Sequence, residues 1–166
     1  MHVLQLALII ITMTAFSQEY EVDKAAAQEV SKIKFLEGNW SGSGWMFARD
    51  GTKHEFKQTE KVSFKLDNTA LLIEGMGKSE GEVIHNALAI ITYNQESGHY
   101  NFNSWLSSGL SGQYKAELIE NDLYWYPNEY IRYIITIDAE GQWFETGEMK
   151  RGDDWMQFFE MTLSKN

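Results

Sequence analysis

The chain has 166 residues, of which 43% are hydrophobic and 14% aromatic, and its formal net charge at pH 7 is -10. That composition indicates a folded domain with a substantial core and excludes a disordered chain. An acidic surface repels phosphate backbones, so we expect no nucleic-acid partner. The chain has no cysteine, which excludes disulfides, a thiol nucleophile and cysteine-ligated metal centres.

Residues 1–17 have the pattern of a signal peptide. An apolar run from Val3 to Phe16 ends in Ala15-Phe16-Ser17, with small residues at the positions that signal peptidase requires. We therefore expect cleavage after Ser17 and a periplasmic or secreted protein. No lysine or arginine precedes the run. Because the run is shorter than the about 20 apolar residues of a transmembrane helix, we expect no stable membrane span.

Residues 18–37 form an N-terminal segment that contains the predicted helix. From Asp23 to Leu36 the apolar residues Ala26, Val30 and Ile33 recur with helical spacing. Asp23 can cap the start of this helix, because its carboxylate accepts hydrogen bonds from free backbone N–H groups. We expect the helix to cover one end of a barrel.

Residues 38–166 have the pattern of an all-β domain. Short runs rich in β-branched and aromatic residues alternate with turn residues at regular spacing. No connection is long enough for a Greek-key crossover, which favours a closed, antiparallel, up-and-down barrel of about ten strands. The ten predicted strands are 40–48, 53–66, 69–78, 84–94, 99–107, 112–119, 122–126, 130–137, 142–150 and 155–164.

The second predicted strand shows which side chains face inward. Every second residue from Lys53 to Lys65 is charged or hydroxylic, so that face must meet water. The other face contains His54, Phe56, Gln58, Glu60, Val62, Phe64 and Leu66. Gln58 and Glu60 therefore lie among the inward side chains, where a simply packed core would not require polar groups.

Directly opposed residues in a hairpin share a face, so the register can be extended from strand to strand. Across Asp67-Asn68, Glu60 should oppose Gly75, and Gln58 should oppose Gly77. The glycines would leave space beside this polar pair. Further extension predicts the following inward and outward residues. Inward are Trp45, Phe47, Ala116, Leu118, Leu123, Trp125, Ile131, Tyr133, Thr146, Glu148, Gln157 and Phe159; outward are Arg132, Glu145 and Glu160. A β-bulge would invert the assignment beyond it, and the candidate positions are Gly42, Gly44, Gly109 and Gly147.

The segment Glu37-Gly38-Asn39-Trp40 resembles the glycine-x-tryptophan that opens the first strand of lipocalin-like (calycin) barrels. Nearly all of the mature chain is similar to an uncharacterised bacterial family, a domain of unknown function, with a lipocalin-like barrel. This resemblance implies an interior cavity and carries no settled activity. The segments that match are residues 85–94, 98–100, 131–133, 147–149 and 155–161.

A distant cousin of that family, the haem-binding nitrobindins, ligates iron through a histidine late in the barrel. This sequence has His2, His54, His85 and His99 and no histidine afterwards. We therefore expect no haem and no other cofactor. The histidines lie on different predicted strands without a short paired spacing, so no metal site is predicted either.

The candidate chemical groups are the two predicted inward carboxylates, Glu60 and Glu148. They could act in proton transfer or hold a ligand, and they could equally lie at a wet rim or bond to neighbouring polar residues. Residues 107–111 contain hydroxyls on a loop but lack a nucleophile elbow and acid–histidine partners, so no catalytic residue is assigned. No phosphate loop or dinucleotide fingerprint is present.

The sequence thus predicts an exported barrel that binds a small, largely apolar or amphipathic molecule, as a monomer or homodimer. The predicted ligand-binding residues are Trp45, Gln58, Glu60, Trp105, Trp125, Tyr133, Glu148 and Gln157. The alternative is a small barrel enzyme that uses an interior glutamate as general acid or base. A third hypothesis is an interaction protein with an exposed apolar face. That face would comprise Ala87, Ala89, Ile91, Tyr93, Tyr100 and Phe102.

Overall fold

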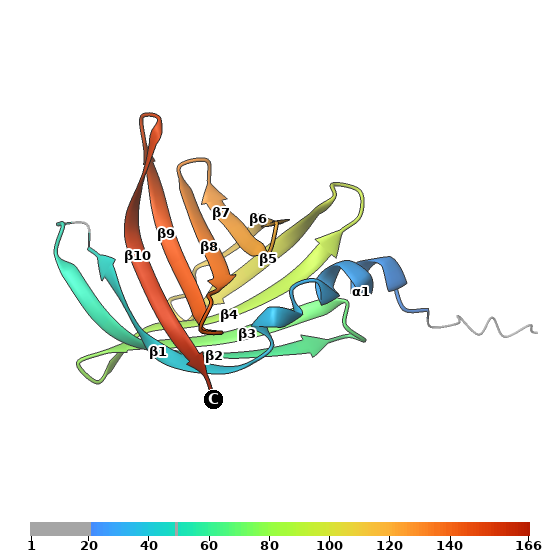
Figure 1. Cartoon of the computed structure of the whole chain (residues 1–166), viewed down its shortest axis with the longest axis horizontal. Helices are drawn as coiled ribbons and strands as arrows, with labels where there is room; N and C mark the ends of the chain where they lie inside the picture. Colours follow the sequence, from blue (N-terminus) through green and yellow to red (C-terminus); the bar gives the residue numbers. More distant parts are fainter. Residues whose placement is uncertain (1–20, 49) are drawn as a thin grey trace, which may run out of the picture.

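The computed structural model describes residues 21–48 and 50–166, which form one closed antiparallel barrel (Figure 1). Each strand pairs with its sequence neighbours, and β1 pairs with β10 to close the barrel. The predicted fold class and strand number are therefore confirmed. The strands are β1 Gly38–Phe47, β2 Lys53–Lys65, β3 Ala70–Ser79, β4 Glu82–Asn94, β5 His99–Leu106, β6 Ser111–Ile119, β7 Asp122–Asn128, β8 Ile131–Ile137, β9 Trp143–Arg151 and β10 Asp154–Lys165. The predicted signal peptide lies outside the described residues and stays a prediction.

The first strand approaches its partner β10 very closely, and glycine makes this possible. A Cβ on Gly42 would lie 2.0 Å from the backbone oxygen of Thr162, and one on Gly44 would lie 2.3 Å from that of Glu160. Neither contact is sterically possible, so a side chain at either position would push the two strands apart. The glycines of the opening segment thus allow the last strand to close the barrel against the first.

The N-terminal segment covers one end of the barrel, as predicted. Helix α1 (Lys24–Ser31) is followed by a 3-10 turn, η1 (Lys34–Leu36), and the carboxylate of Asp23 accepts a 2.9 Å hydrogen bond from the backbone N–H of Ala26. Figure 1 shows α1 beside the barrel end formed by β3 and β4, against which it packs. The indole of Trp40 donates to the Leu36 carbonyl at 2.8 Å.

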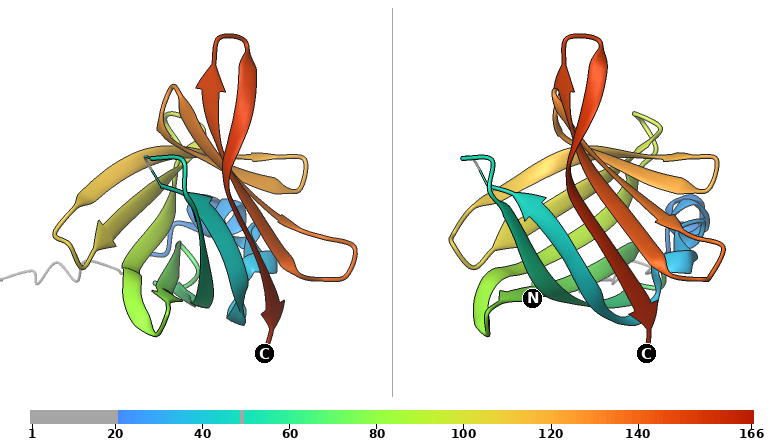
Figure 2. Two further views of the ribbon diagram at one scale, coloured as in Figure 1. Left: turned by 90° about the vertical axis from the view of Figure 1, so that its left-hand side faces the viewer. Right: turned by 60° about the vertical axis from the view of Figure 1, so that its left-hand side comes forward.

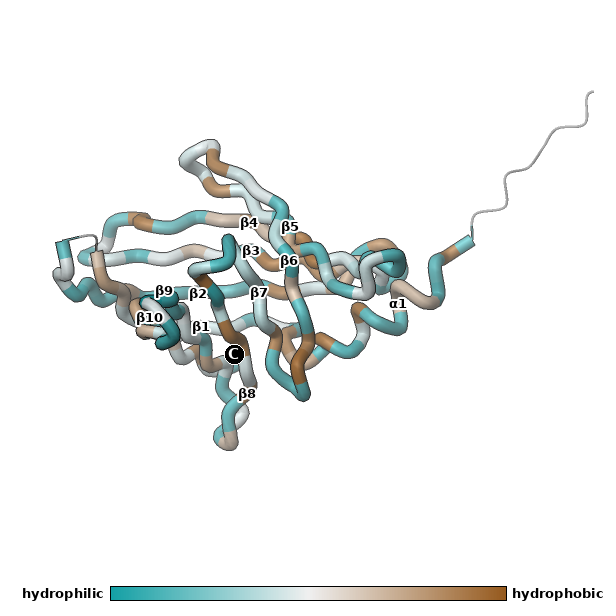
Figure 3. The backbone as a smooth tube through the Cα atoms, turned by 90° about the horizontal axis from the view of Figure 1, so that it is seen from above, coloured by the Kyte–Doolittle hydropathy of each residue, from teal (hydrophilic) through white to brown (hydrophobic). Residues whose placement is uncertain are grey.

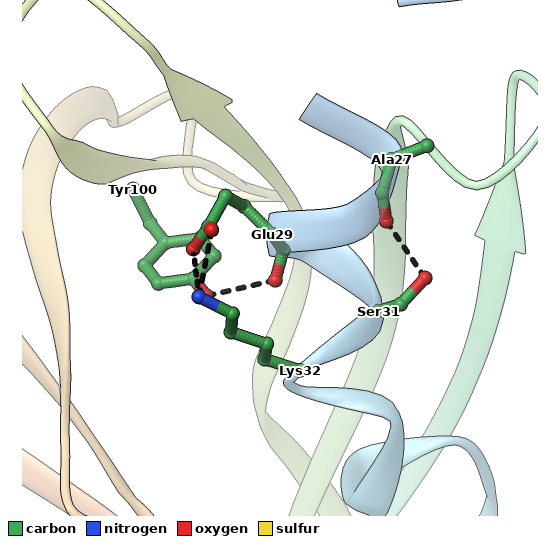
Figure 4. A network of polar contacts seen from close by, with 5 residues as sticks. All are labelled: Ala27, Glu29, Ser31, Lys32 and Tyr100. Atoms are coloured by element: carbon green, nitrogen blue, oxygen red, sulfur yellow. Dashed lines mark hydrogen bonds and ion pairs between the residues drawn. The ribbon is translucent and has the colours of Figure 1, made fainter. Parts of the chain in front are cut away.

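A second anchor joins the helix to β5. Tyr100 donates its hydroxyl hydrogen to the backbone carbonyl of Glu29 at 2.9 Å, and Lys32 forms an ion pair with the Glu29 carboxylate (Figure 4). Within the helix, the hydroxyl group of Ser31 donates a hydrogen bond to the backbone carbonyl of Ala27. Partial burial, together with the negative charge of Glu29, raises the pKa of Tyr100 to about 12. Tyr100 therefore remains a neutral hydrogen-bond donor throughout the physiological range.

The hydrophobic core extends from the helix into the barrel. Val30, Ile33 and Leu36 pack there without exposure, together with strand residues such as Leu71 and Leu163. Trp40 and Trp143 make an edge-to-face contact with ring centroids 5.9 Å apart. Seen along a perpendicular direction in Figure 3, hydrophobic and hydrophilic positions alternate along the strands, as expected when one face is buried.

Three hairpins share one loop geometry, and this geometry corrects part of the predicted register. In residues 48–52, 106–110 and 138–142, the first backbone N–H of the loop donates to the fifth carbonyl, and a glycine with positive φ occupies the fourth position. This pattern is a tight turn followed by a glycine bulge. The predicted four-residue turn at 49–52 was one residue too short, so β1 was placed on the wrong face.

The same error affects the β8–β9 hairpin, where Tyr133 opposes Gly147 and Ile135 opposes Glu145. The prediction that Glu145 faces outward and Glu148 inward was therefore wrong. A further irregularity lies between Gln157 and Phe159 of β10. The bulged residue, Phe158, separates the outward Gln157 from Phe159, which faces inward opposite Gly147.

The β9–β10 hairpin extends beyond the rest of the barrel (Figure 2).

The predicted outer apolar face was wrong. Its residues Ala89 and Ile91 on β4 and Tyr100 and Phe102 on β5 are buried, whereas Leu88 on β4 is 36% exposed. Among the helices of the described part of the chain, none has the length and apolar character to cross a bilayer.

Candidate functional site

A cavity of about 450 Å³ lies inside the barrel beyond the packed core. This volume falls within the range of about 300–1,000 Å³ that is usual for small-molecule sites. Apolar and aromatic side chains form most of the wall, including Phe56, Phe102, Trp125 and Phe159, and Trp143 lies at the deep end. Met46 and Ile84, beside the β1–β2 and β3–β4 loops, are 37% and 50% exposed, so they form the mouth.

Strand β2 places a polar pair on this wall. Gln58 and Glu60 are 6% and 8% exposed, and the Gln58 amide donates to Glu60 Oε1 at 2.6 Å. Gln58 lies between Gly42 and Gly77, and Glu60 between Trp40 and Gly75, as the register of β1, β2 and β3 requires. The predicted oppositions of Glu60 to Gly75 and of Gln58 to Gly77 are confirmed.

The glycines are needed because the polar side chains occupy the space beside them. A Cβ on Gly75 would lie 2.7 Å from both carboxylate oxygens of Glu60, and a Cβ on Gly77 would lie 2.6 Å from Gln58 Oε1. Both distances are shorter than van der Waals contact. The carboxyl group of Glu60 therefore lies over the backbone of β3 rather than over a neighbouring side chain.

Glu60 has an unusual electrostatic environment. Within the described part of the chain, its Oε2 atom is buried and has no hydrogen-bond partner. Burial raises the pKa of Glu60 from 4.5 to about 7, and the hydrogen bond from Gln58 opposes this shift in part. A proton on this carboxyl group is consequently favoured well above the pH at which an exposed glutamate ionises.

A second buried carboxyl group, Glu145 of β9, borders the same cavity. It is 7% exposed and accepts a 3.1 Å hydrogen bond from the indole of Trp143. Burial, and after it the charge of Glu60, raise the pKa of Glu145 to about 8, and the hydrogen bonds from Trp143 and Trp125 oppose this shift in part. The two carboxyl groups thus interact across the interior and resist ionising together.

Stacked aromatic rings form the wall near these acids. Trp125 lies between Phe102 and Tyr133, with centroid separations of 4.6 and 4.4 Å and nearly parallel planes. Phe56 and Phe159 form another stack at 5.7 Å. Burial and the nearby Glu145 raise the pKa of Tyr133, which therefore remains protonated.

The structure places the eight predicted site residues in two groups. Four of them line the cavity: Gln58, Glu60, Trp125 and Tyr133. Whether they bind a ligand stays a prediction. The inward placement was wrong for the other four, Trp45, Trp105, Glu148 and Gln157, which lie on the outer face.

These outer residues have polar or exposed surroundings. Trp45 donates to Glu160 Oε1 at 3.2 Å, and Trp105 is 45% exposed. Gln157 donates to Glu160 Oε2 at 2.7 Å. Glu148 forms an ion pair with Arg132 at 2.6 Å. Arg132 was predicted to share the outer face with Glu145 and Glu160, but its partner in the structure is Glu148.

Sequence reasoning missed Glu145, because its assignment depended on the length of one loop. The available signal was the recurrence of glycine at the fourth position of residues 48–52, 106–110 and 138–142. Recognising that motif twice would have moved both β1 and β9 onto their observed faces. Glu145 would then have joined Glu60 inside the barrel.

The histidine and acidic side chains of the described residues are dispersed over the barrel. Among the described residues, no three His, Asp or Glu side chains lie close enough to hold a metal ion. His85 is the histidine that borders the cavity, at the mouth, and partial burial lowers its pKa. His54 lies at the start of β2, at the mouth end of the barrel. His99 is the first residue of β5 and lies at the opposite end, next to the helix.

Similar solved structures have the same fold. The barrel is similar to the crystal structure of Rv2717c from M. tuberculosis, with a TM-score of 0.61, 12% identity, and coverage of 88% of this chain and 99% of that one. It is also similar to the S-type phycobiliprotein lyase CPES from Guillardia theta, with a TM-score of 0.54, 10% identity, and coverage of 85% and 93%. These similarities support a lipocalin-like barrel. No family model matches the sequence, and no curated protein does so either.

Proposed function

We propose that this protein is an exported barrel that binds one small, largely apolar molecule with a polar end. The observation that carries the proposal is the cavity of about 450 Å³, whose aromatic walls lead to the buried polar groups Gln58, Glu60 and Glu145. A core selected only for stability would fill such a space, because empty volume costs packing energy. Similarity to a phycobiliprotein lyase supports the use of this fold around a small molecule.

The wall chemistry supports a ligand that is mostly apolar. Phe56, Phe159 and Trp125 offer flat, hydrophobic contact area, and a few convergent polar groups at one end would fix orientation. Tyr133 and Gln58 would contribute to that orientation. A strongly hydrated sugar or nucleotide would leave many polar groups unpaired against these walls.

Native mass spectrometry of the protein purified from its own cells tests the proposal. We expect a non-covalent adduct that fits the cavity and is lost when Trp125 is replaced by Ala. A matched control is Trp105→Ala, which removes an equally large side chain from the outer face and should retain the adduct. A protein that never carries an adduct, and that binds no apolar probe, would refute a ligand-binding role.

A second candidate function is acid–base catalysis inside the barrel. The observation that favours it is the pair of buried carboxyl groups, Glu60 and Glu145, with pKa values raised to about 7 and about 8 beside one cavity. A carboxyl group with a pKa near neutrality can both donate and accept a proton. Incubating the co-purified molecule with the protein and with Glu60→Gln separates the functions. Conversion by the parent alone supports catalysis, whereas recovery of the unchanged molecule from both supports binding.

A further inference from the structure

The charge balance of the cavity wall is one-sided. The titratable side chains that line it in the described part of the chain are Glu60, Glu145, His85, Tyr114 and Tyr133, and no lysine or arginine lines it. His85 lies at the mouth, and Tyr133 is a neutral phenol whose pKa is raised. The deep end therefore contains two acidic groups and no cationic side chain.

The hydrogen bonds that the protein supplies do not compensate for this arrangement. Glu60 accepts from Gln58 through Oε1 only, while Oε2 is buried without a partner among the described residues; Glu145 accepts from the indoles of Trp143 and Trp125. The residues opposite Glu60, Trp40 on β1 and Gly75 on β3, provide no further donor to it. A buried carboxylate with incomplete hydrogen bonding is costly unless a proton or a positive charge neutralises it.

We infer that the deep end of the cavity binds the protonated nitrogen of an amphipathic amine, with Glu60 and Glu145 as its counter-charges. This inference rests on the proposed ligand-binding function and specifies the chemical class of the ligand. An alkylammonium group has up to three N–H donors. It can therefore satisfy Glu60 Oε2 and reach a second acceptor, while its hydrocarbon tail lies along the aromatic wall towards the mouth.

The aromatic residues suit a cation as well as an apolar tail. The Phe102–Trp125–Tyr133 stack borders the same cavity as the two acids. Aromatic faces attract positive charge, most strongly where water is excluded. A carboxylic acid ligand of the same length would instead place its negative charge beside Glu60 and Glu145, which repel it.

Binding of a cation should displace protons from the carboxyl pair. In the empty protein near pH 6 both groups hold their protons, because burial raises both pKa values. An ammonium ion favours their ionised forms, so protons are released on binding, and the affinity rises as the pH increases from 6 to 8.5. The amine itself stays charged over this range, since alkylamines resemble the lysine side chain with a pKa of about 10.4.

The test uses three probes with the same eight-carbon chain: n-octylamine, 1-octanol and octanoate. Calorimetric titration of the full mature protein at pH 7.5 should show that octylamine binds at least about tenfold tighter than octanol, with octanoate weakest. Titration of octylamine in two buffers with different ionisation enthalpies should show proton release. Equal affinity for octylamine and octanol would overturn the amine assignment while leaving a ligand-binding barrel intact; failure of all three probes would count against the barrel function itself.

Isosteric variants locate the effect. Glu60→Gln and Glu145→Gln should each reduce the preference for octylamine over octanol at least about fivefold and should retain octanol binding, which also reports that the variant is folded. Glu148→Gln is the matched control, because Glu148 lies on the same strand as Glu145 but faces outward to Arg132. A preference that persists in both interior variants, or that falls equally in the control, would overturn the inference.

Discussion

Replacing Glu60 by Gln should make the empty protein more stable at alkaline pH and leave its stability almost unchanged at pH 5. The amide has nearly the same shape as the protonated carboxyl group and can still accept the hydrogen bond from Gln58. It differs in having no charged form. The variant therefore removes the one state of Glu60 that the buried site disfavours.

The size of the effect follows from the pKa of Glu60, which burial raises from 4.5 to about 7. In the unfolded chain the group ionises above pH 4.5, whereas the folded protein keeps the proton until about pH 7. Folding stability therefore falls as the pH increases through this interval and then levels off. Because a tenfold change in proton affinity is worth about 1.4 kcal/mol, the loss from Glu60 is about 3 kcal/mol.

Urea unfolding followed by tryptophan fluorescence measures this difference. At pH 8 we expect Glu60→Gln to be more stable than the parent by about 3 kcal/mol, with convergence near pH 5. Glu148→Gln makes the same change on the outer face, where it removes the ion pair with Arg132; its difference from the parent should therefore be small and similar at both pH values. If the parent and Glu60→Gln lose stability in parallel between pH 5 and pH 8, the reasoning about burial is wrong.

Three further outcomes are expected. Gly75→Ala should cost about 1–3 kcal/mol in urea unfolding, because its Cβ would lie 2.7 Å from the Glu60 oxygens, and the cost should shrink in a Glu60→Ala background. Val62→Asp buries a charge at a position 3% exposed and should abolish the cooperative thermal transition, whereas Ser63→Asp on the outer face should shift it little. Arg132→Ala should cost only about 1 kcal/mol, because its partly exposed ion pair is screened, and should leave octylamine binding unchanged; a loss of binding would contradict its outer position.

The sequence was sufficient to predict the fold because its signals are local and repeated. Alternation along β2 identified the inward face, and the Asp67-Asn68 hairpin correctly transferred that face to Gly75 and Gly77. Every strand boundary in the structure lies within about 2 residues of its predicted position, which is the usual precision of boundary assignment. Strand number and connectivity follow from the short loops between the strands.

The candidate site was only half predictable, and the reason is the two-residue period of a strand. A loop one residue longer than assumed moves every following side chain to the other face. This happened at residues 48–52 and 138–142, where Trp45 and Glu148 exchanged faces with their neighbours. The bulge at Phe158 has the same effect and leaves no clear mark in the sequence. Glu60 was assigned correctly because its face follows from the alternation within β2 itself, and β2 contains no bulge.

The helix at one end of the barrel gives the cavity a single direction. Since α1 and the packed core lie beyond Glu60 and Glu145, a molecule bound in the proposed way would enter with its polar group leading and leave with its tail first. Its tail would remain nearest the mouth throughout its stay. Any acceptor at that end would meet hydrocarbon before charge, so transfer would begin at the apolar tail, and the contact with the acids would be the last to break.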